Sequence, residues 1–252
     1  MAADSKRFLV TAGGTREQID RVRDWGNVFT GGTGFRIAQA LAEVGQVDLV
    51  TSNRDHQREL ADAAGPLRAV PFASYAELRG AIASLMATQH YDAVYMTAAV
   101  SDYTPNGVYR IVDRRLQEDD PTRETWTVEN VSADKVKSAF DEIAVAGRKT
   151  EKIVDLFRGT WGYRGILVKF KLEVGIDRAS LIAIGQASRR ASGADYLVAN
   201  TLEMVSGPSA GAYLLSEAGE EWVQRKLLAD RLRRLAMEAF QQAGVERDNK
   251  II

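Results

Sequence analysis

A glycine-rich turn near the start of the chain has the residue types most suited to binding an anion. Thr30, Gly31, Gly32 and Gly34 precede apolar residues at helical spacing, which predicts a helix that begins near Thr33. The first N–H groups of a helix have no partner within it, and the positive end of the helix dipole lies there. The turn is therefore predicted to bind a phosphate; the alternative is that its glycines only make a tight strand-to-helix turn.

The amino-acid composition leaves few residues that could act as a covalent nucleophile in catalysis. The chain has no cysteine, so it has no disulfide, no thiolate nucleophile and no cysteine-based metal site. The only histidines, His56 and His90, lie in polar surroundings outside any metal-ligand spacing, and we expect both to be surface residues. We therefore expect no metal site made by protein side chains, no thioester chemistry and no histidine-based triad.

Several familiar cofactor and catalytic motifs are absent from the sequence. There is no Gly-x-Gly-x-x-Gly dinucleotide fingerprint, no Gly-x-x-x-x-Gly-Lys phosphate loop and no His-Glu-x-x-His zinc motif. No tyrosine is followed four residues later by lysine, the pair that is typical of short-chain dehydrogenases. An NAD(P)-dependent reductase is therefore disfavoured, although it stays an alternative.

The overall composition is that of an ordinary globular protein and argues against two classes of partner. The 252 residues are 45% hydrophobic and 27% charged, which is enough to bury a substantial core. A net charge of −1 gives no general attraction to nucleic acid or to an anionic membrane. No apolar run is long enough to span a bilayer, and Met1–Arg7 lacks the apolar core of a signal peptide, so we expect a cytoplasmic protein.

The elements that must position the glycine turn alternate between strand and helix. Strands are predicted at 8–11, 47–51, 67–72 and 91–100, and helices at 33–44 and 74–88. This order is typical of α/β folds and predicts a doubly wound, mostly parallel, Rossmann-like sheet, with ligands at the carboxyl ends of its strands. The residues that fall at those ends are Gly13, Gly14, Asn27 and Asp102.

The second half of the chain continues this pattern after an interruption. Residues 104–134 are charged and contain prolines, which predicts an exposed excursion. Two short strand-like runs, 212–216 and 221–223, indicate a small strand flap at about 205–225. There is no internal repeat, and we expect one α/β domain over residues 1–252. The remaining predicted elements are helices at 152–159, 177–192 and 226–243 and strands at 166–173 and 194–200.

Short motifs along the chain are similar to those of one enzyme family. They are Val10-Thr-Ala-Gly-Gly-Thr-Arg-Glu, Asn27-x-x-Thr-Gly-x-x-Gly, Ala98-Ala-Val-Ser-Asp-Tyr, Lys135-Val-Lys-Ser, Val168-Lys-Phe-Lys-Leu-Glu and Val198-Ala-Asn-Thr-Leu-Glu. In this order, and over nearly the whole chain, they resemble elements of phosphopantothenate–cysteine ligase, also called phosphopantothenoylcysteine synthetase, in its stand-alone form.

This resemblance implies a ligase of coenzyme A biosynthesis that joins 4′-phosphopantothenate to cysteine. The carboxylate would attack the α-phosphate of ATP or CTP, with Mg²⁺ present, and the cysteine amine would then attack the acyl-nucleotide anhydride. No protein nucleophile is needed, which agrees with a chain without cysteine. The resemblance also implies a homodimer, with the strands at 207–223 as a candidate contact element.

The resemblance further implies roles for individual residues. Asn27 and Lys135 would be catalytic, and Thr30, Arg189 and Arg190 would join Asn27 in binding the substrate. The residues that would contact the nucleotide are Gly13, Gly14, Thr15, Gly31, Gly34, Ala99, Asp102, Phe170 and Asn200.

Each of these side chains also has an ordinary structural interpretation. Asn27 and Asn200 are residue types that are common in turns, and Asp102 is a typical loop-capping residue. Lys135 lies in a charged loop where lysines are usually solvated, and an aromatic residue such as Phe170 in an apolar strand is often part of the core.

Three departures from the family pattern leave the substrates open. Phe29 stands where the family has a hydroxyl side chain, and Thr201 stands where bacterial members have aspartate. Arg189 and Arg190 stand in the region where bacterial members carry lysines. The choice between ATP and CTP is therefore open, and a catalytically altered binding protein related to the ligase is a further alternative.

Overall fold

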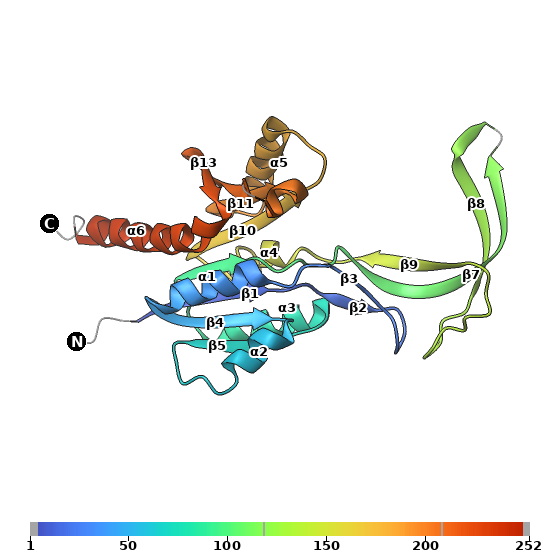
Figure 1. Cartoon of the computed structure of the whole chain (residues 1–252), viewed down its shortest axis with the longest axis horizontal. Coiled ribbons are helices and arrows are strands. Elements are labelled where there is room, and N and C mark those ends of the chain that lie inside the picture. Colours follow the sequence, from blue (N-terminus) through green and yellow to red (C-terminus); the bar gives the residue numbers. More distant parts are fainter. Residues whose placement is uncertain (1–4, 118, 208, 249–252) are drawn as a thin grey trace.

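The structure is a computed structural model that describes residues 5–117, 119–207 and 209–248. Its main body is an eight-stranded sheet in the order β13-β12-β11-β10-β6-β1-β4-β5 (Figure 1). The strands are β1 (Lys6–Ala12), β4 (Gly45–Thr51), β5 (Leu67–Pro71), β6 (Ala93–Met96), β10 (Ile166–Glu173), β11 (Tyr196–Thr201), β12 (Gly211–Ser216) and β13 (Gly219–Gln224).

Neighbouring strands run parallel from β5 to β11, and β12 and β13 add an antiparallel edge. The two runs that were interpreted as a flap thus extend the main sheet. The order of the parallel strands reverses between β1 and β6, which is the doubly wound Rossmann pattern. The predicted fold class is confirmed.

Helices cover both faces of this sheet, as the apolar residues on both sides of its strands require. The helices are α1 (Gly32–Ala42), α2 (Arg54–Leu60), α3 (Tyr75–Thr88), α4 (Ile153–Leu156), α5 (Arg178–Ala191) and α6 (Leu228–Asp248), with 3₁₀ turns η1 (Leu202–Val205) and η2 (Arg225–Leu227). On one face, α1 and α6 pack against Phe8 and Val10 of β1. On the other face, α3 and α4 pack against Leu9, and α5 packs against Leu197 of β11.

Two antiparallel sheets lie outside the main body. β2 (Arg16–Gln18) and β3 (Asp24–Gly26) form a short ribbon within the loop before α1. β7 (Tyr103–Gln117), β8 (Asp120–Asn130) and β9 (Ile143–Lys149) form a three-stranded arm that projects away from the body (Figure 1). The interruption predicted at 104–134 is therefore built from long strands. Polar and charged residues on both faces of the arm hide the alternation that identifies a strand.

One other prediction needs correction, and one helix was not predicted. His56 was expected on the surface, but it lies in α2, is 8% exposed and stacks on Phe35 of α1, with ring centroids 4.2 Å apart. Burial lowers the pKa of this histidine, which favours the neutral ring beside α1. α2 itself was not predicted, because its sequence Arg-Asp-His-Gln-Arg-Glu-Leu has too few apolar residues to show a helical period.

No helix within the described residues is long and apolar enough to cross a membrane.

Candidate functional site

The glycine turn at the start of α1 needs its glycines for two different reasons. Gly31 is the N-cap residue and has a left-handed backbone with φ of 83°. A Cβ atom on Gly31 would lie 2.2 Å from the backbone nitrogen of Gly13, so the two loops touch through bare backbone. A Cβ atom on Gly34 would lie 2.3 Å from Oγ1 of Thr97, at the end of β6. Together these contacts press α1 against the ends of β1 and β6.

The first turn of α1 has no side-chain cap. Gly31 offers no side-chain oxygen, and the first helical bond runs from the Phe35 N–H to the Gly31 carbonyl over 3.0 Å. The N–H groups of Gly32, Thr33 and Gly34 are therefore available to an anion, in the position where the helix dipole favours one. A Cβ atom on Gly32 would meet nothing within 4 Å, so this glycine faces open space. We refer to Gly31–Gly34 as the glycine cradle.

Asn27 is held beside the cradle by a network of loop hydrogen bonds. Its Nδ2 donates to the carbonyl of Ala99 over 2.9 Å. The same carbonyl accepts the N–H of Thr15 at 3.0 Å, and the Ala99 N–H donates to the carbonyl of Gly13 at 2.9 Å. The loops that follow β1 and β6 are thus joined at the point where the strand order reverses, and they fix the amide of Asn27 there.

A cavity of about 410 Å³ lies between the glycine cradle and the carboxyl ends of β10 and β11. In open α/β sheets this edge, at the reversal of strand order, is where ligands bind. Seven of the predicted site residues line it: Gly13, Thr30, Gly31, Gly34, Ala99, Phe170 and Asn200.

Three further predicted residues, Gly14, Thr15 and Asn27, do not line the cavity but belong to the loops beside it. Gly14 packs against Asn27, because a Cβ atom on Gly14 would lie 3.1 Å from Cβ of Asn27. Thr15 is fully buried and its hydroxyl donates to Oγ of Ser101 over 2.9 Å. Thr15 therefore acts on the loop geometry and not on a ligand directly.

Four predicted residues are not brought to the cavity. Asp102 forms an exposed ion pair with Lys152, with 2.6 Å between Oδ1 and Nζ. Lys135 is exposed on the loop between β8 and β9. Arg189 and Arg190 lie in the last turn of α5, which leads into the start of β11 and so lies at the opposite edge of the sheet. Both arginines precede the Val198 motif in the sequence, but they lie at the end of α5 that is remote from the cavity.

The Lys135 loop is held by a buried carboxylate that sequence reasoning missed. Oδ2 of Asp20 accepts the N–H of Val136 at 3.1 Å and bonds to the guanidinium of Arg23. Arg23 in turn donates to the Val136 carbonyl at 2.7 Å. These bonds, chiefly the one from the Arg23 side chain, hold the pKa of Asp20 well below its ordinary value.

Sequence reasoning also missed three cations that line the cavity: Arg36, Lys171 and Arg225. Lys171 is paired with Glu173 at 2.9 Å. Arg36 lies one residue beyond Phe35 on α1, and Arg225 lies in η2, far away in the sequence. Only the packing of α1 beside α6 brings these two arginines together, so no local sequence pattern could have linked them.

The segment Gly207-Pro-Ser-Ala-Gly has the spacing of a hydrolase nucleophile elbow, a motif that also escaped sequence reasoning. Of this segment the structure describes Gly207, Ser209, Ala210 and Gly211. Gly211 begins β12, so a strand follows the serine, whereas a helix follows it in a nucleophile elbow. The two histidines of the chain lie in α2 and directly after α3, on the far half of the sheet. The segment therefore lacks the context for a serine nucleophile.

The protein is a Rossmann-like α/β protein. At the reversal of its strand order lies a glycine turn with uncapped N–H groups, which is the kind of turn that suits an anion. Residues 3–117 match the family model described as the DNA/pantothenate metabolism flavoprotein C-terminal domain. The matched part is slightly less than half of the chain, and its similarity to this family confirms the resemblance found in the motifs.

Individual relatives show the same similarity. The coenzyme A biosynthesis bifunctional protein CoaBC of Mycobacterium tuberculosis is 30% identical over 197 residues, which cover 78% of this chain and 42% of that protein. The chain thus spans less than half the length of this relative. The crystal structure of the DNA/pantothenate metabolism flavoprotein from Streptococcus pneumoniae superposes with a TM-score of 0.72 at 25% identity, over 95% of this chain and 100% of that one. The C-terminal domain of CoaBC has the same fold, with a TM-score of 0.62 at 20% identity, over 94% of this chain and 96% of that one.

Proposed function

We propose that this protein is a ligase that forms the amide bond between 4′-phosphopantothenate and cysteine. The observation that carries the proposal is the uncapped glycine cradle next to the anchored amide of Asn27, at the cavity where the strand order reverses. The similarity to this family supports the same reaction, because the CoaBC relative is named for coenzyme A biosynthesis. The comparisons give no support to the NAD(P)-dependent reductase alternative.

The proposed reaction has two steps and needs no protein nucleophile. In the first, a carboxylate oxygen of 4′-phosphopantothenate attacks the α-phosphorus of ATP or CTP, and pyrophosphate leaves with its bonding electron pair. In the second, the amine of cysteine attacks the acyl carbon, loses a proton and expels the nucleoside monophosphate. The protein contributes by orienting the reactants and by stabilising charge on the phosphoryl and acyl oxygens.

The residues around the cavity match these two tasks. The N–H groups of the glycine cradle hold phosphoryl oxygen atoms, since they are uncapped donors at a helix N-terminus. The amide of Asn27 contacts the reacting acyl and phosphoryl oxygens, because it offers a donor and an acceptor without charge. Phe170 and Asn200, from β10 and β11, contact the nucleotide on the other wall of the cavity.

Magnesium enters this scheme with the nucleotide. The described residues contain no group of three or more His, Cys, Asp or Glu side chains that could hold a metal ion by themselves. Mg²⁺ commonly keeps several waters and binds through substrate phosphates with one or two carboxylates. We therefore assign the ion to the triphosphate, where it offsets the charge of the attacked phosphate. The roles predicted for Lys135, Asp102, Arg189 and Arg190 stay predictions.

The proposal is tested by incubating the purified protein with 4′-phosphopantothenate, cysteine, Mg²⁺ and either ATP or CTP. Pyrophosphate release and the mass of the amide product are measured for each nucleotide, which also decides between them. The ligase assignment is wrong if neither nucleotide yields product. The cytoplasmic location and the homodimer belong to the same proposal, and a monomer in sedimentation at assay concentration would remove the dimer from it.

The variant Asn27→Ala tests the role of the anchored amide. Loss of a positioned hydrogen-bonding group at a reacting oxygen lowers kcat by about 10²–10³-fold in well-studied enzymes, and we expect a loss of this order. Asn27 is exposed, so the circular dichroism spectrum should not change. Gln39→Ala, which removes an exposed amide from α1, is the matched control and should keep full activity. Unchanged turnover of Asn27→Ala would exclude Asn27 from the mechanism.

A further inference from the structure

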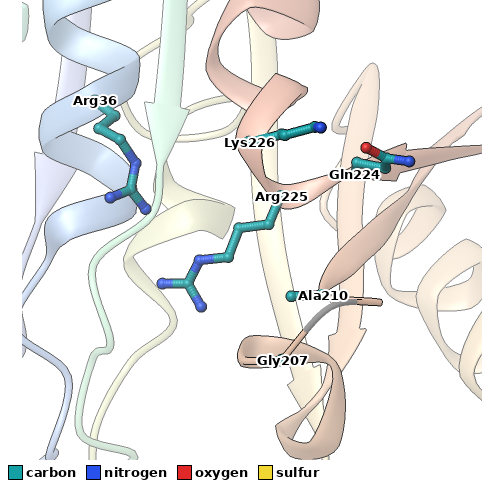
Figure 2. A pocket seen from close by; sticks show the side chains of 6 residues that line it. All are labelled: Arg36, Gly207, Ala210, Gln224, Arg225 and Lys226. Atoms are coloured by element: carbon teal, nitrogen blue, oxygen red, sulfur yellow. The ribbon is translucent and has the colours of Figure 1, made fainter.

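A second cavity, of about 490 Å³, adjoins the first. It is lined by Arg36, Gly207, Ala210, Gln224, Arg225 and Lys226 (Figure 2). Arg36 and Arg225 line both cavities, so the second one is a side chamber of the proposed active site and not a separate depression.

The side chamber concentrates positive charge that has no carboxylate partner. Among the described residues, no Asp or Glu lies within ion-pair distance of Arg36, Arg225 or Lys226, which appear in none of the ion pairs that the structure contains. The arginines further along α6 behave differently. Arg231 pairs with Glu221 at 2.9 Å, and Arg233 pairs with Glu43 at 2.8 Å. The chamber thus differs from the neighbouring face of α6, where Arg231 and Arg233 are neutralised by carboxylates.

The two arginines converge although they come from distant parts of the chain. Figure 2 shows the guanidinium group of Arg36 extending from α1 and that of Arg225 extending from η2 into the space between these elements, whereas Lys226 points toward Gln224. Like charges that face the same cavity repel, and an anion bound between them would offset that repulsion. Guanidinium groups suit a phosphate, because their planar donors can bind two of its oxygens at once.

The backbone around the chamber holds Arg225 in this position. The N–H of Arg225 donates to the carbonyl of Ala210 over 2.9 Å, which ties the start of η2 to the loop before β12. Arg225 is half-buried, so its stem is packed while its guanidinium reaches the cavity. Gly207 and Ala210 form the opposite wall and leave room, because they have little or no side chain.

We propose that Arg36 and Arg225, with Lys226 at the rim, form a second anion subsite that binds a phosphate group of a substrate. The proposal rests on the proposed function, because that reaction brings two phosphate-bearing substrates to one cavity. The glycine cradle holds one phosphate with uncharged donors, and the side chamber holds another with charged ones. The second phosphate comes either from the diphosphate end of the nucleoside triphosphate or from the phosphomonoester of 4′-phosphopantothenate.

Binding measurements without turnover test the subsite and identify the source of its phosphate. Isothermal titration calorimetry is carried out with inorganic pyrophosphate, 4′-phosphopantothenate and pantothenate, which lacks the phosphate. The proteins are the wild type, Arg36→Gln, Arg225→Gln and the double variant. Arg58→Gln is the matched control, because Arg58 is an exposed arginine of α2 that pairs only with Asp55. Thermal melts check that each variant is folded.

We expect Arg36→Gln and Arg225→Gln each to raise the Kd of one phosphate probe by about tenfold or more, since each removes a charge-assisted hydrogen bond. If the affected probe is pyrophosphate, the subsite binds the nucleotide. If the affinity advantage of 4′-phosphopantothenate over pantothenate is lost instead, the subsite binds the acid. Arg58→Gln should stay within about twofold of the wild type for every probe.

The subsite is refuted if both arginine variants bind pyrophosphate and 4′-phosphopantothenate as the wild type does, or if Arg58→Gln weakens binding equally. Failure of the ligase assignment is a different result. A wild-type protein that forms no amide product, yet binds one of these probes in an arginine-dependent way, keeps the subsite and loses the reaction.

Discussion

Substitution by alanine at two adjacent glycines of the cradle, Gly31 and Gly32, should have opposite effects on the stability of the protein. Gly31 has a φ of 83°, and a Cβ atom there would lie 2.2 Å from the Gly13 nitrogen, 2.8 Å from its Cα and 3.0 Å from the carbonyl carbon of Ala12. All three are backbone atoms, which cannot rotate away as a side chain can. Gly32, the next residue, has a φ outside the positive range and nothing within 4 Å of the position of its Cβ atom.

The magnitudes follow from these contacts. An alanine in the left-handed conformation costs about 1–2 kcal/mol, and a backbone shift that relieves an overpacked contact costs roughly a further 1–3 kcal/mol. Gly31→Ala should therefore lower the free energy of unfolding by about 2–5 kcal/mol. At about 2–4 °C per kcal/mol for a chain of this size, its Tm should fall by roughly 4–20 °C. Gly32→Ala should be neutral or stabilising by up to about 1 kcal/mol, because alanine is the better helix former.

Scanning calorimetry of the wild type and the two variants measures both effects directly. Because the substitution is the same and the two positions are adjacent, the comparison isolates the combined effect of the left-handed backbone of Gly31 and its contact with Gly13. Equal Tm values for Gly31→Ala and Gly32→Ala would show that the two loops do not touch as described. A large loss of stability in Gly32→Ala would show instead that the open side of the cradle is occupied by protein.

Two further predictions concern buried carboxylates. Because the pKa of Asp20 is lowered in the folded state, its stabilisation is present above the pKa of about 4 of an unfolded aspartate and is lost as the pH falls further. The urea midpoints of wild type and Asp20→Asn should thus differ near neutral pH, and the difference should shrink steadily as the pH falls below about 4; a constant difference would contradict this role. Tyr91→Phe removes a hydrogen bond to the buried carboxylate of Asp48 and should lower the free energy of unfolding by about 1.5–3 kcal/mol. Chemical denaturation measures this change, and a loss below about 0.5 kcal/mol would count against that bond.

Elements with complete local signals were predicted accurately from the sequence. α3 begins after Ser74, whose hydroxyl accepts the N–H of Glu77 at 3.2 Å while the Glu77 carboxylate accepts the N–H of Ser74 at 3.4 Å. α5 begins after Asp177, whose carboxylate accepts the N–H of Ser180 at 2.7 Å. The spacing of apolar residues then fixed the extent of both helices, because these signals act within a few residues.

The parts of the candidate site that were predicted from the sequence are also made of residues that lie close together in the chain. The glycine cradle is one continuous turn, and its predicted helix start at Thr33 is one residue from the observed start at Gly32. Arg36 and Arg225 could not be found in the same way, because their meeting depends on the packing of α1 against α6. The exposed excursion at 104–134 was predicted but its strands were not, since antiparallel strands solvated on both faces keep no apolar alternation.

The arm has a consequence for the way the main sheet forms. β6 and β10 are neighbours in the sheet, yet the long segment between Met96 and Ile166 separates them in the chain. Within that segment, Tyr103 at the start of β7 pairs with Lys149 at the end of β9. Pairing of Tyr103 with Lys149 closes most of this segment within the arm itself, so the connection that remains between β6 and β10 is much shorter than the segment. Because the entropy cost of closing a loop grows with its length, the arm shortens the search that joins the two halves of the sheet.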